Sequence, residues 1–261
     1  MVSASSVTID PLLFPQLVQA MLMLIVQLAP LLAWILTATT QAVPSEDEKA
    51  PQKSGAERTF VVSLPSYWTE MPPAVIFQQV EIKLSDPEYV AAARLFTVKG
   101  TLHHIYRIQN PTLFTQFTAE KLKMHQVYAN HEWNSRLLPL NERLLYHGTK
   151  RENVKDINMN GFDRSYANAA VYGFGSYFAR DMSYSAEIRF SPPDTAGHKY
   201  VYVARVLVGM YCTANTESMD RPPKQSNGLS FDSVVDSLYD PSVFVIFRDT
   251  RAYPEYLYEF S

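Results

Sequence analysis

His147 ends a short apolar run, and Gly148 and Thr149 follow it at once (NERLLYHGT). An imidazole at the end of a strand can hydrogen-bond a nearby carbonyl as a structural residue, or it can contact a ligand and carry a proton. A single histidine is more often structural. Three further segments, in chain order, favour a ligand site here: GFGSYFARDMSYSAE, which begins at Gly173, then DPSVFVIF, then AYPEYL.

Other residue patterns with chemical potential are weaker. Gly173 and Gly175 invite comparison with a dinucleotide-binding loop, but Phe178 stands where a third glycine is required, and a strand pattern follows instead of a helix. We interpret the two glycines as shaping a turn. Cys212 is the only cysteine, which excludes an intramolecular disulfide and cysteine-rich zinc sites and fits a reducing compartment. The spacing of the other histidines predicts no metal site.

The elements around His147 can be predicted from local signals. Residues 143–148 (RLLYHG) have the composition of a strand. Thr149 and Glu152 match a T-x-x-E capping box, which predicts a helix, and Gly161 is a typical C-terminal stop for it. We therefore expect His147 at the end of a strand, followed by a tight turn into a helix.

Cap-and-proline pairs and hydrophobic periodicity predict the other elements. Asp86 with Pro87, and Asn110 with Pro111, are each typical of the start of a helix. The predicted helices span 86–96 and 112–129, and the predicted strands span 103–109, 176–179, 200–209, 243–247 and 255–260. This mixture predicts one α+β domain over residues 59–261.

The bulk composition restricts the class of protein. The chain has 261 residues with 47% hydrophobic residues, enough for a substantial core. Its formal net charge is −3 and its pI is about 6.1, so no basic excess indicates nucleic-acid binding.

The first 42 residues form an apolar leader, and residues 43–58 have the composition of a polar linker. Residues 17–40 are long enough to span a bilayer as a helix, although Gln19, Gln27 and Pro30 interrupt them. Three interpretations stay open: a membrane anchor, a cleaved signal peptide, or an apolar segment that packs elsewhere. Because Lys and Arg follow the segment and none precedes it, an anchor would leave the rest of the chain facing the cytoplasm. The expected location is intracellular.

The ordered motifs resemble the catalytic domain of the poly(ADP-ribose) polymerase (PARP) family, the diphtheria-toxin-like ADP-ribosyltransferases. IQNPTLF, NERLLYHGT, GFDRSYA, GSYFA, YSA and FRDTRAYPEYL are most similar to the macrodomain-bearing, mono-ADP-ribosylating branch, over about residues 64–260. The resemblance implies an ADP-ribosyltransferase fold, in which split, twisted antiparallel β-sheets are flanked by helices. It also implies NAD as co-substrate in the cleft; the expectation of no metal comes from the histidine spacing and the single cysteine above.

The resemblance assigns roles to the residues around the first motif. His147 is expected to hydrogen-bond the hydroxyls of one of the two NAD riboses. Gly148 has no side chain, so its backbone could approach the nicotinamide carboxamide closely. Thr149 is expected near the adenosine half.

The second motif supplies the expected nicotinamide pocket. Tyr177 matches the aromatic residue that stacks on the nicotinamide ring, and Ala179 leaves room beside it. Ser185 matches the hydroxyl that holds the carboxamide, with Tyr184 before it in the YSA segment. Phe190 stands at about the position of a second stacking tyrosine. The loop 163–173 matches the one that covers the donor site, and Phe174 replaces a lysine common between the two glycines.

The third catalytic position is not acidic in this chain. Polymerising members have a glutamate there, and counting back from YPEYL places Val243 at this position, with Ser242 or Phe244 if the count is off by one. The resemblance therefore implies transfer of a single ADP-ribose to a protein acceptor. Two alternatives stay open: a silent NAD- or ADP-ribose-binding module, and a polymerase that uses another acid such as Asp249. Phosphorylated nucleic-acid ends stay open as an alternative acceptor.

Overall fold

The structure is a computed structural model that describes residues 62–129, 140–166, 171–214, 219–226 and 228–261. The predicted apolar leader (1–42), the predicted linker (43–58) and the first three residues of the predicted domain lie outside these residues. Within the described ranges, no helix is both long enough and apolar enough to cross a membrane. The span proposed for residues 17–40 is therefore untested.

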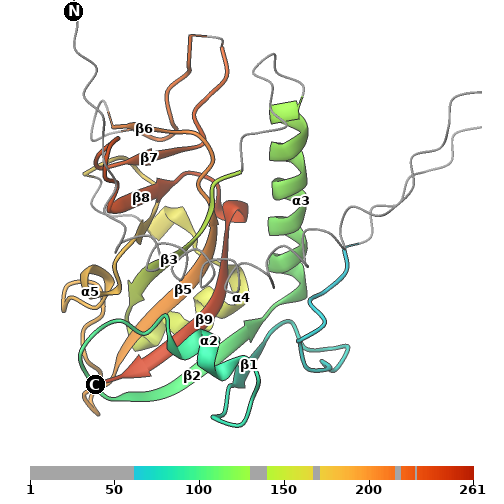
Figure 1. Cartoon of the computed structure of the whole chain (residues 1–261), viewed down its shortest axis with the longest axis vertical. Helices are drawn as coiled ribbons and strands as arrows, with labels where there is room; N and C mark the ends of the chain where they lie inside the picture. Colours follow the sequence, from blue (N-terminus) through green and yellow to red (C-terminus); the bar gives the residue numbers. More distant parts are fainter. Residues whose placement is uncertain (1–61, 130–139, 167–170, 215–218, 227) are drawn as a thin grey trace, which may run out of the picture. The chain divides into compact units, whose positions relative to one another are not determined.

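The described part of the chain forms one nine-stranded sheet with the order β1-β2-β9-β5-β3-β4-β8-β7-β6 (Figure 1). Its strands are β1 (Gln78–Glu81), β2 (Leu102–Gln109), β3 (Glu142–Thr149), β4 (Ser176–Ala179), β5 (Lys199–Leu207), β6 (Tyr211–Thr213), β7 (Ser233–Val235), β8 (Val243–Ile246) and β9 (Ala252–Phe260). All neighbouring strands are antiparallel except β6 and β7, which are parallel.

The sheet narrows to one residue pair between β3 and β4. Only Tyr146 and Ala179 are in register there, whereas β3 and β5 share an eight-residue ladder from Glu142 to Thr149. The expected pair of split sheets is thus realised as two halves of one sheet, joined at Tyr146–Ala179. Both His147 and Tyr177 lie within two residues of this junction.

Helices flank the sheet, and α3 (Pro111–Ala129) is the longest in the described ranges (Figure 1). The others are α2 (Tyr89–Ala93), α4 (Val154–Asn160) and α5 (Met182–Ser185), with 3-10 turns at Arg151–Asn153, Arg164–Tyr166 and Asp249–Arg251. α5 packs against β3 and β4, which brings it to the junction between the two halves.

The start of α3 confirms the predicted cap. The Asn110 side-chain oxygen accepts a hydrogen bond from the Leu113 N–H at 3.1 Å, and Pro111 is the first helical residue. The Asn110 amide also donates to the backbone carbonyls of Asn158 and Met159 in α4. One fully buried side chain therefore caps one helix and fixes the end of another.

Two other helix starts were predicted wrongly. Thr149 closes β3 opposite Tyr200, with its side chain buried, so it cannot turn to cap the next helix. A 3-10 turn intervenes, and α4 begins at Val154 without a side-chain cap. Gly161 does end α4, with a φ of 78° and its N–H bonded to the Ile157 carbonyl.

The second error concerns the helix predicted over 86–96, which is reduced to the five residues of α2. The Asp86 carboxylate accepts the Lys83 N–H and closes the preceding turn, so it does not cap the helix.

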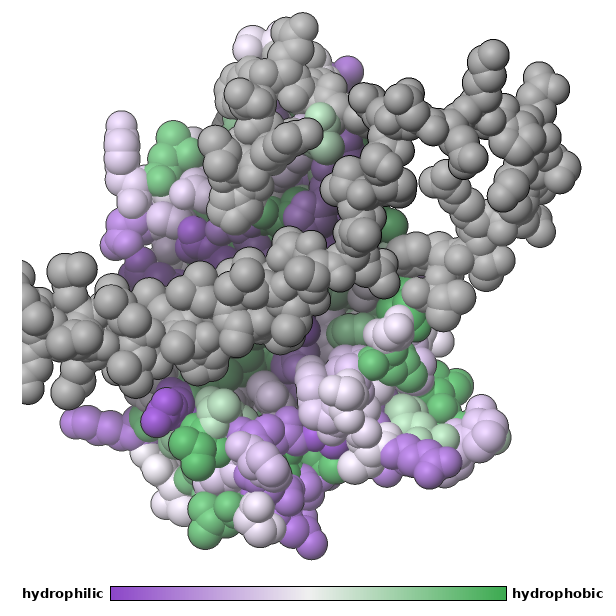
Figure 2. All heavy atoms as spheres, turned by 45° about the vertical axis from the view of Figure 1, so that its right-hand side comes forward, coloured by the Kyte–Doolittle hydropathy of each residue, from purple (hydrophilic) through white to green (hydrophobic). Residues whose placement is uncertain are grey.

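The core lies along the central strands. β5 and β9 are buried along most of their length, and Tyr200, Tyr202, Tyr253 and Tyr258 are among the largest fully buried side chains. On the face shown in Figure 2, described hydrophobic residues lie in small groups among hydrophilic ones. The buried strands β5 and β9 therefore lie on one side of β3, which carries residues to the narrow junction.

Candidate functional site

His147 is half-buried near the end of β3, and its imidazole crosses the junction between the two halves of the sheet. Its Nδ1 lies 2.8 Å from the backbone carbonyl oxygen of Tyr177 in β4. Because a carbonyl oxygen only accepts, Nδ1 must carry the proton and donate it. In the neutral ring Nε2 is then an acceptor, and it has no hydrogen-bond partner within the described residues.

The surroundings of His147 keep the imidazole neutral. Burial lowers its pKa below the ordinary value of 6.5, and this outweighs the hydrogen bond to Tyr177, which raises it. The rings of Phe162 and Phe178 lie with centroids 5.0 and 5.6 Å from the imidazole and hold its plane. Both interpretations of this histidine therefore fit: it bonds a backbone carbonyl, and its other nitrogen is open to a ligand hydroxyl.

Gly148 shows why the next position must lack a side chain. A Cβ on Gly148 would lie 2.0 Å from the Ser185 carbonyl oxygen and 2.9 Å from the Phe190 Cβ. The close approach brings together three of the predicted site residues, Gly148, Ser185 and Phe190, from β3 and the α5 region. Ser185 is 4% exposed, and its hydroxyl makes no hydrogen bond within the described part of the chain.

Tyr177 lies half-buried on β4, and both hydrogen-bonding functions of its hydroxyl are used. It accepts from the Tyr172 N–H at 2.9 Å and donates to the Gly173 carbonyl at 2.8 Å. Burial raises the pKa of the phenol above 10.0, so it stays protonated. The ring is thereby held in one orientation at the predicted nicotinamide position.

An aromatic pair lies next to the glycine contact. The rings of Tyr184 and Phe190 are 5.0 Å apart at 33°. The guanidinium of Arg189 lies 5.1 and 4.6 Å from their centroids and is also 2.8 Å from a Glu187 carboxylate oxygen.

Val243 begins β8 directly opposite Ala179, and both are buried, with exposures of 4% and 2%. No acidic side chain therefore takes the third position. The carboxylate that contacts the start of this strand is that of Asp236, which accepts the N–H groups of Ser237, Ser242 and Val243 and the Ser242 hydroxyl. Burial raises the pKa of Asp236, but these hydrogen bonds outweigh burial and lower it, so Asp236 is an anion that anchors the start of β8.

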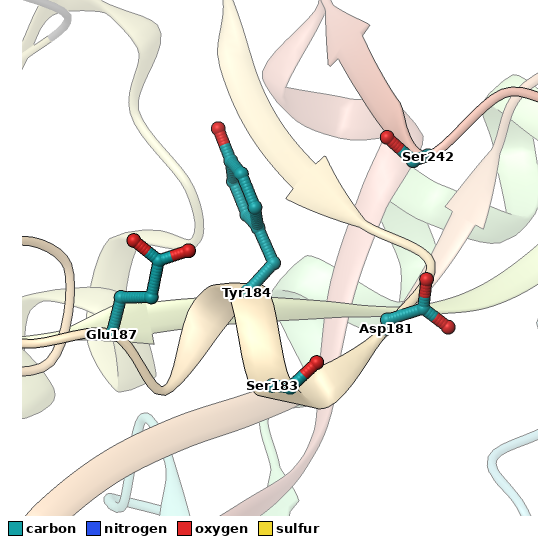
Figure 3. Close-up of a pocket in the computed structure, with 5 residues that line it drawn as sticks. All are labelled: Asp181, Ser183, Tyr184, Glu187 and Ser242. Atoms are coloured by element: carbon teal, nitrogen blue, oxygen red, sulfur yellow. The ribbon is translucent and has the colours of Figure 1, made fainter.

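A cleft opens between α5 and the start of β8, with a volume of about 290 Å³ (Figure 3). Figure 3 shows the Tyr184 ring on one side and Ser242 and Asp181 across from it. The charges around it are paired: Arg180 contacts both Asp181 and Asp240. The lining residues are Asp181, Ser183, Tyr184, Glu187 and Ser242.

The predicted site residues therefore lie around the junction of the sheet, and Thr149 is the exception. His147, Gly148, Ser185 and Phe190 meet at the end of β3, while Tyr177, Ala179 and Val243 lie across the junction on β4 and β8. Thr149 is only 3% exposed, and its hydroxyl lies 3.5 Å from the Lys150 carbonyl, so its role toward a ligand stays a prediction.

Two features of the site were not found from the sequence. Asp236 and the hydroxyl contacts of Tyr177 both act on backbone groups, which leave no mark in the residue pattern. Asp249, considered as an alternative acid, accepts the Arg164 N–H beyond the Ile246 end of β8, opposite to the end that carries Val243. It therefore lies away from the junction.

Comparison with known proteins gives the class to which this fold and site belong. The family profile of the poly(ADP-ribose) polymerase catalytic domain matches residues 88–233, and the chain belongs to this family. Over 206 residues, covering 76% of the chain, it is 39% identical to human protein mono-ADP-ribosyltransferase PARP14. It is 31% identical to mouse protein mono-ADP-ribosyltransferase PARP11 over 225 residues and 31% identical to mouse protein mono-ADP-ribosyltransferase PARP12 over 226 residues, covering 76% and 84% of the chain.

The matched regions are only parts of those relatives. They cover 11% of PARP14, 65% of PARP11 and 30% of PARP12.

Proposed function

We propose that the protein is an NAD-dependent ADP-ribosyltransferase that transfers a single ADP-ribose to a protein acceptor and releases nicotinamide. The observation that carries this proposal is the convergence of His147, Gly148 and Ser185 at the junction of the sheet. The site then contains three groups that could bind a ligand. They are Nε2 of His147, which can accept a hydrogen bond, the backbone of Gly148, which no side chain covers, and the hydroxyl of Ser185, which has no partner in the described residues. These groups fit a ligand that carries ribose hydroxyls and a carboxamide.

The site acts by orientation and electrostatics. NAD supplies the ADP-ribosyl group: its bond to nicotinamide breaks, nicotinamide leaves with the bonding electrons, and an acceptor oxygen forms the new bond. Nε2 of His147 accepts a ribose hydroxyl and orients it. The backbone of Gly148 and the hydroxyl of Ser185 hold the carboxamide, and the ring of Tyr177 supports the nicotinamide plane. Fixed contacts of this kind lower the barrier because they need no reorganisation.

Val243 supports transfer of one unit instead of chain growth. A buried valine cannot accept a proton or orient a hydroxyl, so this position cannot activate the ribose of an attached ADP-ribose as the next acceptor. An acceptor carboxylate is already a nucleophile and needs no such help. The phosphate at a phosphorylated nucleic-acid end is also already a nucleophile, so such ends are a second candidate acceptor.

The test is incorporation of labelled NAD by the full chain, with His147 variants beside it. We expect discrete labelled bands from the wild type and a loss of at least about 10²–10³-fold for His147→Ala. A ladder of products would contradict transfer of single units. Binding of NAD without release of nicotinamide would instead support the silent binding module.

A matched pair of variants separates the two hydrogen bonds of His147. The amide nitrogen of asparagine lies about where Nδ1 lies, so His147→Asn keeps a donor to the Tyr177 carbonyl and loses Nε2. We expect His147→Asn to be as inactive as His147→Ala but closer to the wild type in stability. Near-normal turnover by either variant would overturn the role of Nε2.

We further propose that residues 17–40 anchor the chain with its folded part facing the cytoplasm. The absence of charge in the segment and the lysines and arginine after it support this proposal. A reporter fused after residue 60 should fractionate with membranes. A soluble reporter would contradict the anchor.

A further inference from the structure

We propose that the hydroxyl of Tyr177 is a positioning group, distinct from the ring that supports nicotinamide. It fixes the segment Tyr172–Gly175, which leads from the predicted donor-site loop into β4. This inference rests on the proposed function for the meaning of the ring, but the hydroxyl contacts are independent of it.

The first observation is that one phenol bonds two successive backbone groups. The Tyr172 N–H donates to the hydroxyl at 2.9 Å, and the hydroxyl donates to the Gly173 carbonyl at 2.8 Å. Both distances are those of well-formed hydrogen bonds. Because the contacts are part-buried, loss of the hydroxyl leaves a backbone donor and acceptor that water replaces poorly.

The second observation is that the segment has little freedom of its own. Gly173 has a φ of 106°, a conformation that L-residues with side chains rarely adopt, and a Cβ there would lie 2.7 Å from the Met219 carbonyl oxygen and 2.9 Å from the Phe247 ring. The Phe174 N–H donates to the same Met219 carbonyl at 2.7 Å. The segment therefore contacts Met219 and Phe247 on one side and Tyr177 on the other.

The third observation concerns the exit of the segment. A Cβ on Gly175 would lie 2.6 Å from Val245 Cγ1 and 2.7 Å from the Ile246 carbonyl oxygen. Gly175 therefore lets the chain pass closely over β8, and Phe174 before it is exposed. Among the hydrogen bonds of the described residues, those of the Tyr177 hydroxyl connect this segment to a side chain of the site.

Because the Tyr177 hydroxyl bonds the backbone of Tyr172 and Gly173, the position of the Tyr177 ring and the path of this segment depend on each other. A phenylalanine at position 177 would keep the ring and lose both bonds. The ring would then be free to tilt, and the ligand would have to hold it on binding. Such a change weakens the binding of NAD more than the chemical step, because the reacting groups around His147 are unchanged.

The experiment compares Tyr177→Phe with the wild type in the full chain. We expect the KM for NAD to rise about tenfold, as the loss of two ordinary hydrogen bonds predicts, while kcat changes about threefold or less. The Kd for NAD, measured by calorimetry without acceptor, should rise by a similar factor. Tyr239→Phe is the matched control, since its side chain is fully exposed and its hydroxyl has no partner in the described residues. We expect it to match the wild type.

A second variant tests whether the hydroxyl acts through the segment. Gly173→Ala should raise the KM for NAD through the collision of its Cβ with Met219 and Phe247. If both changes act on one segment, the double variant with Tyr177→Phe should lose less than the product of the single effects.

The outcomes separate this inference from the proposed function. An unchanged KM and Kd for Tyr177→Phe, with an active wild type, would overturn the positioning role alone. A proportional fall in kcat with an unchanged KM would also overturn it. A wild type that binds NAD but transfers nothing would overturn the proposed activity, while the Kd comparison would still decide the role of the hydroxyl.

Discussion

Two titratable groups, the half-buried His147 at the junction and the buried Glu255 in β9, show what distinguishes a binding site from an ordinary buried group. Burial moves the pKa of both toward the neutral form: it lowers that of His147 and raises that of Glu255, although Arg205 opposes the second shift. Glu255 is 6% exposed, accepts the Tyr67 hydroxyl at 2.7 Å through one oxygen, and has no partner for the other within the described residues. A shifted pKa and an unpaired atom are therefore common to both.

The difference lies in what surrounds the unpaired atom. Beside His147, Gly148 has no side chain and lies in contact with Ser185, whose hydroxyl has no partner among the described residues. Glu255 instead has Tyr67 as a hydrogen-bond partner and Arg205 as an opposite charge, and both lower its pKa against the effect of burial. A perturbed pKa indicates burial, and only the gathering of open groups indicates a binding site.

The largest effect should come from removing the space beside Gly148. In Gly148→Ala the new methyl group would meet the Ser185 carbonyl oxygen at 2.0 Å, so β3 or α5 must shift. We expect kcat/KM to fall by about 10²-fold or more, since displacements of about 1 Å have this effect, at a stability cost of about 1–3 kcal/mol. Labelled-NAD kinetics and urea unfolding would measure the two quantities. A variant with wild-type kcat/KM would show that the close approach has no role in binding.

The next effect is the pH dependence at His147. Because its folded pKa is below 6.5, the unfolded state binds more protons just under pH 6.5. The wild type should therefore lose unfolding free energy as the pH falls below 6.5, and His147→Ala should lose less over the same range. Transfer activity should stay flat from pH 8 through 6.5, because the imidazole is already neutral. A fall in activity centred at pH 6.5 or above would contradict the lowered pKa.

The smallest effect should appear at Glu255, with the opposite sign. Its folded pKa is above 4.5, so the folded state binds more protons above that pH. The wild type should lose unfolding free energy as the pH rises from about 4.5 toward neutrality. Glu255→Gln cannot ionise and should lose less, with kcat/KM within about twofold of the wild type, as expected for a residue away from the ligand. A large loss of activity in Glu255→Gln would show that Glu255, like His147, contributes to the site, and would contradict the contrast drawn between them.

The sequence predicted most strands, and the residues that it proposed for the site lie around one junction of the sheet, for identifiable reasons. Aromatic and β-branched runs mark β5 and β8, and the Asn110-Pro111 pair marks α3, because these signals are local. Thr149 failed as a cap because pairing with Tyr200 across the sheet overrode a local motif. The contacts of Asp236 with the start of β8, and those of Tyr177 with Tyr172 and Gly173, were not predictable because their partners are backbone groups.

The single pair that joins the two halves of the sheet has a consequence for how the molecule comes apart. Cooperative units in a protein separate where the fewest contacts cross between them, and here that place is Tyr146–Ala179. The amides of β3 belong to a long ladder with β5, whereas those of β4 belong to a ladder with β8. The two sets should therefore exchange their hydrogens with solvent in separate steps. The ligand, bound across the boundary, would make them exchange as one.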